Sequence, residues 1–405
     1  MRKTWSLLWF IILILLVNNS ALAQTQISNI DFNFLYDINS NLRGKIIASR
    51  QDSSALVLLH INSPLDSIKN FDASYSIINN LNDVITTEIK INNLAHSFLS
   101  EDDNGSQYVL KLKVGDAKYF VLWLTDLNKQ TIYPFVKLIS RHPNSGNMVL
   151  EYANIFTPIF NSYLPINSEI SLKSLRGRQE SIQVDYYDYH FLPASPPMYS
   201  PNDSLAASFD KVNSFSFEST DKLQMVKQGL YYFHLANEEI GQSILVKDAA
   251  YPKFSQIDQL VEALRYLTTE EEYQKMLGSI NKKELFDEFW LNNTSSEVKA
   301  KKAIRAYYTR ANEANILFTT YKEGWKTDMG MIYIIFGAPS SVFMDNNDVM
   351  WIYSKSFNLP DGVSFTFKHI NTAFTDQHYI LQRKAEFQNL WFRTVDMWRS
   401  GKKEF

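Results

Sequence analysis

The amino-acid sequence predicts a multidomain protein in which antiparallel β-sandwich regions of immunoglobulin-like type precede a C-terminal α+β domain. Short segments of alternating apolar residues fill the first part of the chain, and the apolar period becomes that of helices after Tyr251-Pro252. A length of 405 residues also exceeds what one hydrophobic core usually covers. We therefore expect a signal peptide at 1–23, a β-sandwich domain at 24–145, a second β-rich domain at 146–250 and the α+β domain at 251–405.

The first residues have the composition of a secretory signal peptide. Arg2 and Lys3 provide a positive start, 7–17 form an apolar core, and Ala21 and Ala23 supply the small residues before a cleavage site. The apolar core is shorter than the roughly 20 residues that span a bilayer, which disfavours the alternative of an uncleaved membrane anchor. We expect cleavage near Ala23 and a periplasmic or secreted protein without a transmembrane segment in its mature chain.

Composition excludes several classes of site. The chain contains no cysteine, which excludes disulfides, zinc–thiolate sites, cysteine nucleophiles and a lipid anchor on a cysteine. Removal of Arg2 and Lys3 from the 40 basic residues leaves 38 against 43 acidic ones, so the mature chain is mildly acidic. Nucleic-acid binding requires clustered basic residues that neutralise phosphates, and we expect no nucleic-acid partner.

Eight alternating segments predict the strands of the first sandwich. Polar turns such as Asn62-Ser63-Pro64 and Gly115-Asp116 separate them at intervals of about ten residues, as in an immunoglobulin-like domain. The predicted strands are 30–36, 44–48, 55–61, 71–78, 84–91, 108–114, 118–124 and 132–139.

Five further segments predict strands in the second β-rich region, at 169–175, 182–189, 214–217, 229–235 and 243–247. Between the second and the third of these, 192–203 contains four prolines, too many for a central strand. This proline-rich segment is either a binding loop or a mobile surface excursion.

Helical periodicity predicts five helices in the last region, at 256–267, 269–277, 281–291, 295–323 and 385–398. The longest has an N-cap at Ser295-Ser296, and we expect Gly324 to end it in the left-handed conformation that glycine favours. The last is amphipathic and aromatic, so it packs on its own domain or contacts a partner or membrane interface. Strands are expected at 363–370 and 377–383.

The segment 324–330 reads Gly-Trp-Lys-Thr-Asp-Met-Gly and follows the longest helix. Trp325 offers a large apolar side chain, and Thr327 and Asp328 offer oxygen acceptors for backbone amides in a tight turn. Gly330 permits a backbone conformation that a side chain would forbid. The continuous apolar run 331–336 predicts a strand that is buried on both faces.

Five short motifs follow one another along the chain: Phe289-Trp290, Arg310-Ala311-Asn312, 324–328, Gly337-Ala338-Pro339 and Trp351-Ile352-Tyr353. This order resembles the pattern of the GWxTD-domain proteins, a family of exported bacterial proteins whose activity is not established. The resemblance covers 255–405 and implies a set of motif residues: Gly324, Trp325, Thr327, Asp328, Gly330, Gly337, Pro339, Arg310, Asn312, Trp351 and Tyr353. Many family members have arginine after the motif aspartate, whereas this chain has Met329, so no role of that cation is carried over.

Asp328 is the one candidate catalytic residue. Beside a buried tryptophan its carboxyl group would act as a general acid or base, with Arg310 binding an anion. The alternative is structural, with Thr327 and Asp328 capping backbone amides and Arg310 neutralising Asp328 or Glu313. General acid–base catalysis usually requires a partner group, and no second carboxylate or histidine stands near Asp328 in the sequence, so we expect the structural role.

We expect neither a cofactor nor a metal. Only His369 and His378 lie on consecutive predicted strands, and two histidines make half a metal site. Asp345 and Asp348 resemble a fragment of a calcium loop that lacks its glycine and its closing glutamate. The sequence contains no serine elbow, phosphate-binding loop or dinucleotide fingerprint.

Two hypotheses about function follow. The first is an exported, non-catalytic interaction or assembly protein that binds an envelope partner through its β domains and its GWxTD-like domain. The second is an extracytoplasmic hydrolase, or a carbohydrate-active or glycan-binding protein, with Asp328 as the acid and a sugar-stacking platform of aromatic residues: Trp325, Tyr333, Trp351 and Tyr353. Burial separates them, because a sealed Asp328 and a sealed Trp325 leave no site for a substrate.

Overall fold

The computed structural model describes residues 25–51, 53–63, 65–92, 94–102, 105–139, 148–155, 157–174, 179–188, 190–198, 210–235, 241–355 and 361–402. The chain divides into two compact units. The first comprises Met1–Phe32, Gly44–Ser140 and Phe343–Asn346, and the second comprises Asn33–Arg43, Arg141–Val342 and Asn347–Phe405. The predicted signal peptide with Ala21 and Ala23, and the predicted boundary between 145 and 146, lie outside the described residues.

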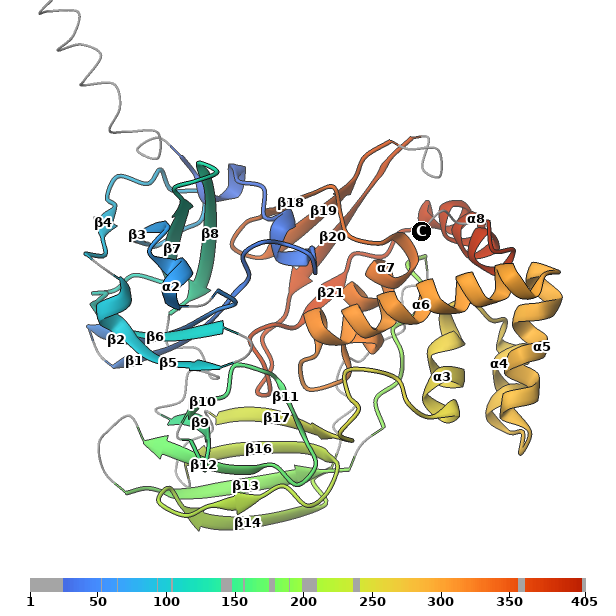
Figure 1. Ribbon diagram of the computed structural model, residues 1–405, viewed down its shortest axis with the longest axis horizontal. Helices are drawn as coiled ribbons and strands as arrows, with labels where there is room; N and C mark the ends of the chain where they lie inside the picture. The colour runs from blue at the N-terminus through green and yellow to red at the C-terminus, as the bar shows by residue number, and fades with distance from the viewer. Residues whose placement is uncertain are drawn as a thin grey trace, which may run out of the picture. The chain divides into compact units, whose positions relative to one another are not determined.

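The first unit is a sandwich of two antiparallel sheets, drawn in blue and cyan in Figure 1. One sheet has the order β1-β2-β6-β5 and the other β4-β3-β7-β8, which is the A-B-E-D and C′-C-F-G order of an immunoglobulin-like domain. The strands are β1 (Gly44–Gln51), β2 (Ser54–Ile61), β3 (Phe71–Ile78), β4 (Ile89–Lys90), β5 (Phe98–Asp102), β6 (Gly105–Lys113), β7 (Tyr119–Asp126) and β8 (Thr131–Leu138). Short helices η1 (Ile27–Asn29), α2 (Leu65–Ile68) and η3 (Leu94–Ser97) accompany them.

Six of the eight strands predicted for this sandwich are confirmed, and two predictions fail. The strand predicted at 30–36 is wrong, since Asn33–Tyr36 forms the 3₁₀ helix η2. There Tyr36 packs on Phe318 and Trp351, with ring centroids 5.9 and 4.9 Å apart, so tertiary contacts in the second unit override the local pattern. The strand predicted at 84–91 shrinks to β4, because only Ile89–Lys90 pairs with β3. β5 was not predicted.

A second sandwich occupies the start of the second unit. Its sheets have the orders β10-β9-β12-β15 and β11-β17-β16-β13-β14, again an immunoglobulin-like arrangement, in which β11 runs parallel to β17. Its core is aliphatic and aromatic, with Leu164, Ile182 and Phe233 fully buried. The strands are β9 (Met148–Tyr152), β10 (Thr157–Pro158), β11 (Tyr163–Pro165), β12 (Glu169–Ser174), β13 (Ser181–Tyr187), β14 (Asn213–Glu218), β15 (Leu223–Gln224), β16 (Gly229–Leu235) and β17 (Gly241–Lys247).

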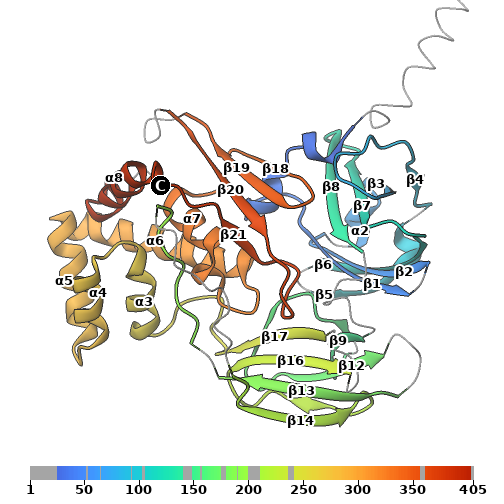
Figure 2. The ribbon, with the colours of Figure 1, turned by 180° about the vertical axis from the view of Figure 1, so that it is seen from behind.

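The rest of the second unit is an α+β domain with one four-stranded sheet of order β18-β19-β20-β21. Figures 1 and 2 show this sheet and helices α6, α7 and α8. Each helix contacts the sheet through an aromatic pair. The ring centroids lie 5.7 Å apart for Phe318 and Trp351, 5.1 Å for Phe336 and Phe365, and 4.8 Å for Phe387 and Phe365. The helices are α3 (Ile257–Ala263), η4 (Leu264–Tyr266), α4 (Glu270–Leu277), α5 (Lys282–Thr294), α6 (Glu297–Phe318), η5 (Gly324–Lys326), α7 (Asp328–Phe336) and α8 (Phe387–Arg399). The strands are β18 (Ser341–Met344), β19 (Asp348–Tyr353), β20 (Val363–His369) and β21 (Tyr379–Leu381).

Candidate functional site

The segment that resembles GWxTD forms one 3₁₀ turn, η5, followed by the first turn of α7. The strand predicted at 331–336 is therefore wrong, because this apolar run continues a helix that is buried on all sides. The prediction that Gly324 ends the long helix is also wrong, since α6 ends at Phe318 and Thr319 follows it.

The two motif glycines are needed for close packing. A Cβ atom on Gly324 would lie 2.0 Å from the carbonyl oxygen of Ala314, and a Cβ atom on Gly330 would lie 1.9 Å from the carbonyl oxygen of Gly324. Neither glycine has a positive φ, so the conformational freedom that we predicted for both is not what their positions require. Their missing side chains let α6, η5 and α7 approach one another.

Thr327 and Trp325 bind backbone and polar groups of their own domain. The Thr327 hydroxyl donates to the Gly324 carbonyl oxygen at 2.7 Å and accepts from the Gly330 amide at 3.0 Å, which caps α7. The Trp325 amide donates to the side-chain oxygen of Asn315 at 3.1 Å, and the side chain of Trp325 is 3% exposed. Asn315 was not predicted, although a buried amide on the apolar stripe of a helix is a signal that the sequence contains.

Asp328 forms a two-pronged ion pair with Arg383, which follows β21. The Arg383 nitrogens donate to the two carboxylate oxygens at 3.0 and 2.6 Å, and the Leu381 amide donates to one of them at 2.7 Å. Both side chains are buried, at 10% exposed for Asp328 and 7% for Arg383. Of the two predicted partners of Arg310, Asp328 is wrong, because its actual partner Arg383 lies 55 positions away in the sequence, beyond the reach of any local pattern. At Glu313, the other predicted partner, burial raises the carboxyl pKa, and the charge of Arg310 opposes this with a smaller effect that lowers it.

Arg310 instead binds the C-terminal end of α7. Its guanidinium donates to the carbonyl oxygen of Ile334 at 3.3 Å and lies over the ring of Trp398, and burial lowers its pKa. The Trp398 indole donates to the Ile335 carbonyl oxygen at 3.1 Å, and the Tyr353 hydroxyl donates to that of Gly337 at 2.8 Å. These side chains satisfy the last carbonyls of a helix that is buried at both ends.

The remaining predicted motif residues contact backbone and side chains of the same domain. Asn312 accepts from the Phe254 amide at 3.1 Å, which fixes the chain that leads into α3. Trp351 is fully buried beneath α6, and Pro339 is buried after the turn at Gly337, where φ is +93°. The predicted residues thus contact α6, α7 and the chain that leads into α3.

A buried charge network surrounds Lys326, the variable residue of the motif. Lys326 is 1% exposed and its ammonium lies 3.3 Å from the carboxylate of Glu323 and 3.8 Å from that of Glu262. Lys247 of β17 also contacts Glu323, at 2.8 Å. Burial raises the pKa of Glu323, but Lys326 and Lys247 outweigh this and lower it to about 2. The network joins the motif to the second sandwich.

The proline-rich segment lies along the motif where the structure describes it, up to residue 198. The Ala194 amide donates to the Lys326 carbonyl oxygen at 3.0 Å, Arg383 donates to the Ser195 carbonyl oxygen at 3.0 Å, and the Lys384 amide donates to that of Pro197 at 3.0 Å. This part of the segment contacts the domain through backbone groups, and the alternatives of a binding loop or a mobile excursion stay predictions.

His378 and His369 do lie on one hairpin, because the Ile370 amide donates to the His378 carbonyl oxygen at 2.8 Å. Burial and the nearby Lys322 lower the pKa of His378 to about 4, so this imidazole is neutral at ordinary pH. Within the described ranges, no group of three or more His, Asp or Glu side chains could hold a metal ion.

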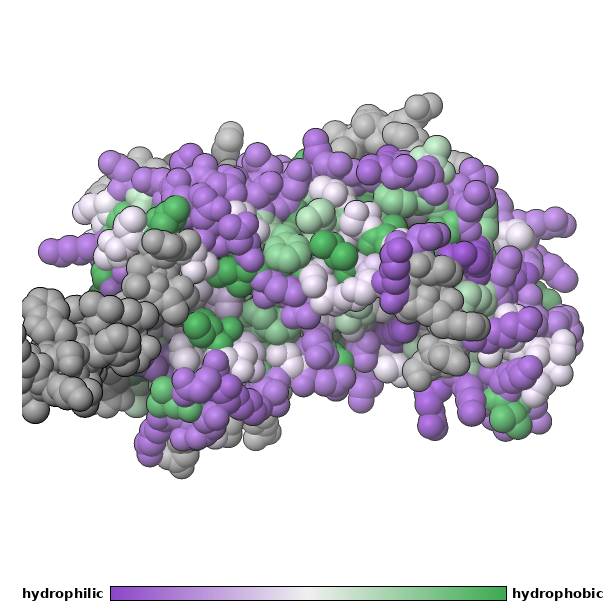
Figure 3. Space-filling view, turned by 90° about the horizontal axis from the view of Figure 1, so that it is seen from above, coloured by the Kyte–Doolittle hydropathy of each residue, from purple (hydrophilic) through white to green (hydrophobic). Residues whose placement is uncertain are grey.

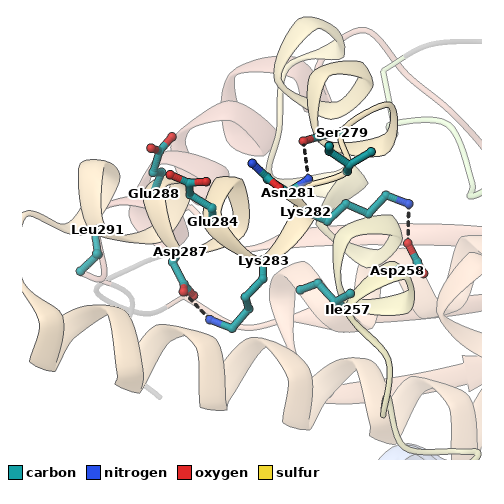
Figure 4. A pocket seen from close by; sticks show the side chains of 11 residues that line it. Ile257, Asp258, Ser279, Asn281, Lys282, Lys283, Glu284, Asp287, Glu288 and Leu291 are labelled. Atoms are coloured by element: carbon teal, nitrogen blue, oxygen red, sulfur yellow. Dashed lines mark hydrogen bonds and ion pairs between the residues drawn. The ribbon is translucent and has the colours of Figure 1, made fainter.

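This domain has a surface depression that is distant from the motif in sequence. It lies between α3 and α5 and is drawn in Figure 4, where Lys282 pairs with Asp258 and Lys283 pairs with Asp287. None of the motif residues lines it. Asp328 and Trp325 are both buried, and neither of them lines this depression.

Comparisons with known proteins place this geometry in a family. A family model described as the GWxTD domain matches residues 229–400. No curated protein matches the sequence. Two solved structures align with 51% of this chain. The three N-terminal domains of the highly immunogenic outer capsid protein of bacteriophage RB49 align over 58% of their length, at 9% identity and a TM-score of 0.16. CBD12 from CALX1.2 aligns over 80% of its length, at 11% identity and a TM-score of 0.12.

With such TM-scores, neither structure carries an argument about this chain. No helix in the described residues has the length and apolarity needed to cross a membrane. The family match begins within the second sandwich, at the first residue of β16, and ends at α8, so it includes the strand that supplies Lys247 to the buried network. The sequence motif and the family match agree, and the chain contains a GWxTD domain within residues 229–400.

Proposed function

We propose that this protein is exported and acts as a non-catalytic interaction module, which binds an envelope protein through its immunoglobulin-like sandwiches and its GWxTD domain. In this proposal the GWxTD domain is a rigid mount for the second sandwich. The observation that carries the proposal is the state of Asp328. Its two oxygens accept three hydrogen bonds from Arg383 and Leu381, and its side chain is 10% exposed.

A general acid or base must reach the proton that it transfers. The carboxylate of Asp328 is occupied by a guanidinium and an amide, and giving up these bonds would leave a buried cation without its partner. The aromatic residues of the hydrolase hypothesis are also covered, since Trp325, Tyr333, Trp351 and Tyr353 are each at most 4% exposed. Buried rings offer no face on which a sugar could stack, so the geometry favours the interaction hypothesis.

The contacts between the second sandwich and the GWxTD domain support the role of a mount. The Ser243 hydroxyl of β17 hydrogen-bonds the Phe374 carbonyl oxygen, and Lys247 pairs with Glu323. Aromatic pairs add to this, with Phe191 5.2 Å from Tyr321 and Tyr187 5.4 Å from Phe374. A preorganised surface loses less freedom on binding than a mobile one, which suits a protein that docks.

Export rests on the sequence of residues 1–23. Its test is the N-terminus of the mature protein, which we expect to be Gln24 after cleavage at Ala23. An N-terminus that retains Leu7 to Val17 would overturn this part of the proposal.

The natural absence of cysteine permits a direct test of partner binding. Single cysteines at Leu99 of β5, Lys222 beside β15 and Glu271 of α4, all exposed, would carry a photoactivatable crosslinker in cells that export the protein. We expect one discrete adduct from at least one sandwich position, and its loss when unlabelled wild type competes.

The hydrolase hypothesis gives the opposite outcome. In that case none of the three positions forms an adduct, and purified wild type releases soluble fragments from envelope glycan whereas a folded Asp328→Asn variant does not. Either result would overturn the interaction proposal. The crosslinking variants leave Asp328 unchanged, so they do not disturb the ion pair that the second assay tests.

A further inference from the structure

Helices α5 and α6 each expose a stripe of charge that has no ion-pair partner among the described residues. On α5, Glu284, Glu288 and Leu291 stand at i, i+4 and i+7, so they share one face. On α6, Val298, Lys302 and Arg305 have the same kind of spacing. All six side chains are exposed, Leu291 by 45% and Val298 by 67%.

Neighbouring charges on these helices are paired, which sets the two stripes apart. Lys283 pairs with Asp287, Lys282 with Asp258 and Lys301 with Glu297. In the part of the chain that the structure describes, Glu284, Glu288, Lys302 and Arg305 have no ion-pair partner. Figure 4 shows Glu284 and Glu288 next to each other on α5, a like-charge pair that disfavours the helix carrying it.

The two stripes complement each other when the helices run antiparallel. Seven residues of helix cover about 10.5 Å, so both stripes have the same length. In that alignment Glu284 meets Arg305, Glu288 meets Lys302 and Leu291 meets Val298, so opposite charges lie together and the apolar ends coincide. Within one molecule α5 and α6 are successive helices and contact each other through other faces, since Phe289 and Trp290 of α5 and Tyr307 of α6 are buried.

We propose that a second copy of this chain is the partner of these stripes, with α5 of one copy docked antiparallel on α6 of the other. Because each copy carries both stripes, a two-fold axis forms the contact twice. Ile280, which is 99% exposed before α5 and borders the depression of Figure 4, adds apolar surface next to the acidic stripe. Hydrophilic and hydrophobic residues are mixed on the face of the molecule that Figure 3 draws. This inference does not rest on the proposed envelope partner.

Sedimentation of the full mature chain provides the test, because self-association depends on concentration by mass action. We expect wild type to form dimers at about 100 µM and to dissociate as salt rises from about 0.15 M to about 1 M, which screens exposed charges. Glu284→Lys with Glu288→Lys, and separately Lys302→Glu with Arg305→Glu, each place like charges in the contact. Each variant alone should associate at least about tenfold more weakly than wild type.

Mixing the two variants gives the decisive result, since the reversed α5 of one then matches the reversed α6 of the other. We expect the mixture, and a variant that carries all four changes, to regain dimers. Asp83→Lys with Glu271→Lys makes the same change in net charge as Glu284→Lys with Glu288→Lys, on exposed residues outside the stripes, and should dimerise like wild type. Circular dichroism confirms that each variant is folded. Monomeric wild type, undiminished dimers in the single-stripe variants, or a mixture that stays monomeric would each overturn the proposal.

Discussion

The ion pair between Asp328 and Arg383 is the most demanding contact of the motif, because two buried charges neutralise each other. Asp328→Ala leaves the guanidinium of Arg383 buried without its partner, and such a loss costs about 3–5 kcal/mol. We expect the free energy of unfolding of the second unit to fall by this amount. Unfolding in guanidinium chloride, followed by tryptophan fluorescence, measures this free energy.

The pair has a matched control and an internal check. Asp287→Ala removes an exposed i, i+4 partner of Lys283 and should change stability by less than about 1 kcal/mol. The double variant Asp328→Ala with Arg383→Met removes both charges, so it should lose clearly less than the sum of the two single variants. Additive losses would contradict the reading of Asp328 and Arg383 as a coupled pair.

At the scale of elements, α7 shows why the sequence analysis failed at 331–336. Six successive apolar residues fit a strand buried on both faces as well as a helix buried all round, and periodicity alone does not separate them. The boundaries do separate them. Thr327 stands as an N-cap, Asp328 lies in the first turn and Gly337 lies just past the end, which together are the start and stop signals of a nine-residue helix.

Other elements were predicted correctly because their sequence patterns are unambiguous. The alternating strands β2, β3 and β7 and the capped helix α4, with Thr269 bonded to the Glu272 amide, appear where the sequence analysis expected them. The contacts of the site were harder to predict from the sequence. Arg383 and the proline-rich segment reach the motif through tertiary contacts, which no local spacing encodes.

The contact between η5 and α7 yields a prediction at this scale. In Gly330→Ala the new Cβ atom would lie 1.9 Å from a backbone oxygen, so α7 must shift from η5. Overpacking of this kind costs about 1–3 kcal/mol, occasionally more. We expect the denaturation midpoint of the second unit to drop, or the variant to fail to fold.

Gly278→Ala is the control, because a Cβ atom there meets only the Gln274 carbonyl oxygen, at 3.4 Å. This change at the end of α4 should leave the midpoint nearly unchanged. Equal effects of the two substitutions would show that close approach at Gly330 does not determine stability.

At the scale of the whole molecule, two buried groups make stability depend on pH. The pKa of His378 is about 4 against a usual 6.5, because burial and Lys322 disfavour its cation. The unfolded chain therefore binds a proton between pH 6.5 and about 4 that the folded chain does not, and stability falls as pH falls through this window. The shift corresponds to about 3 kcal/mol at most.

Glu323 affects stability at lower pH than His378 does, because the folded protein stabilises its charged carboxylate. Its pKa is about 2 against a usual 4.5, since Lys326 and Lys247 outweigh the effect of burial. The unfolded carboxylate takes up a proton near pH 4.5, whereas the folded one does so only near pH 2, so this stabilisation is complete above pH 4.5 and is lost toward pH 2. Substitution of His378 and substitution of Glu323 should therefore each flatten a different part of the plot of stability against pH.

We expect His378→Gln to reduce the slope of stability against pH between 6.5 and 4 while leaving the lower window unchanged, and Glu323→Gln to do the reverse. Denaturation midpoints of wild type and both variants, measured from pH 7 downward at constant ionic strength, provide the comparison. Because the prediction concerns slopes, a general loss of stability in either variant does not obscure it. If both variants follow the wild-type slope throughout, then neither buried group couples its protonation to stability.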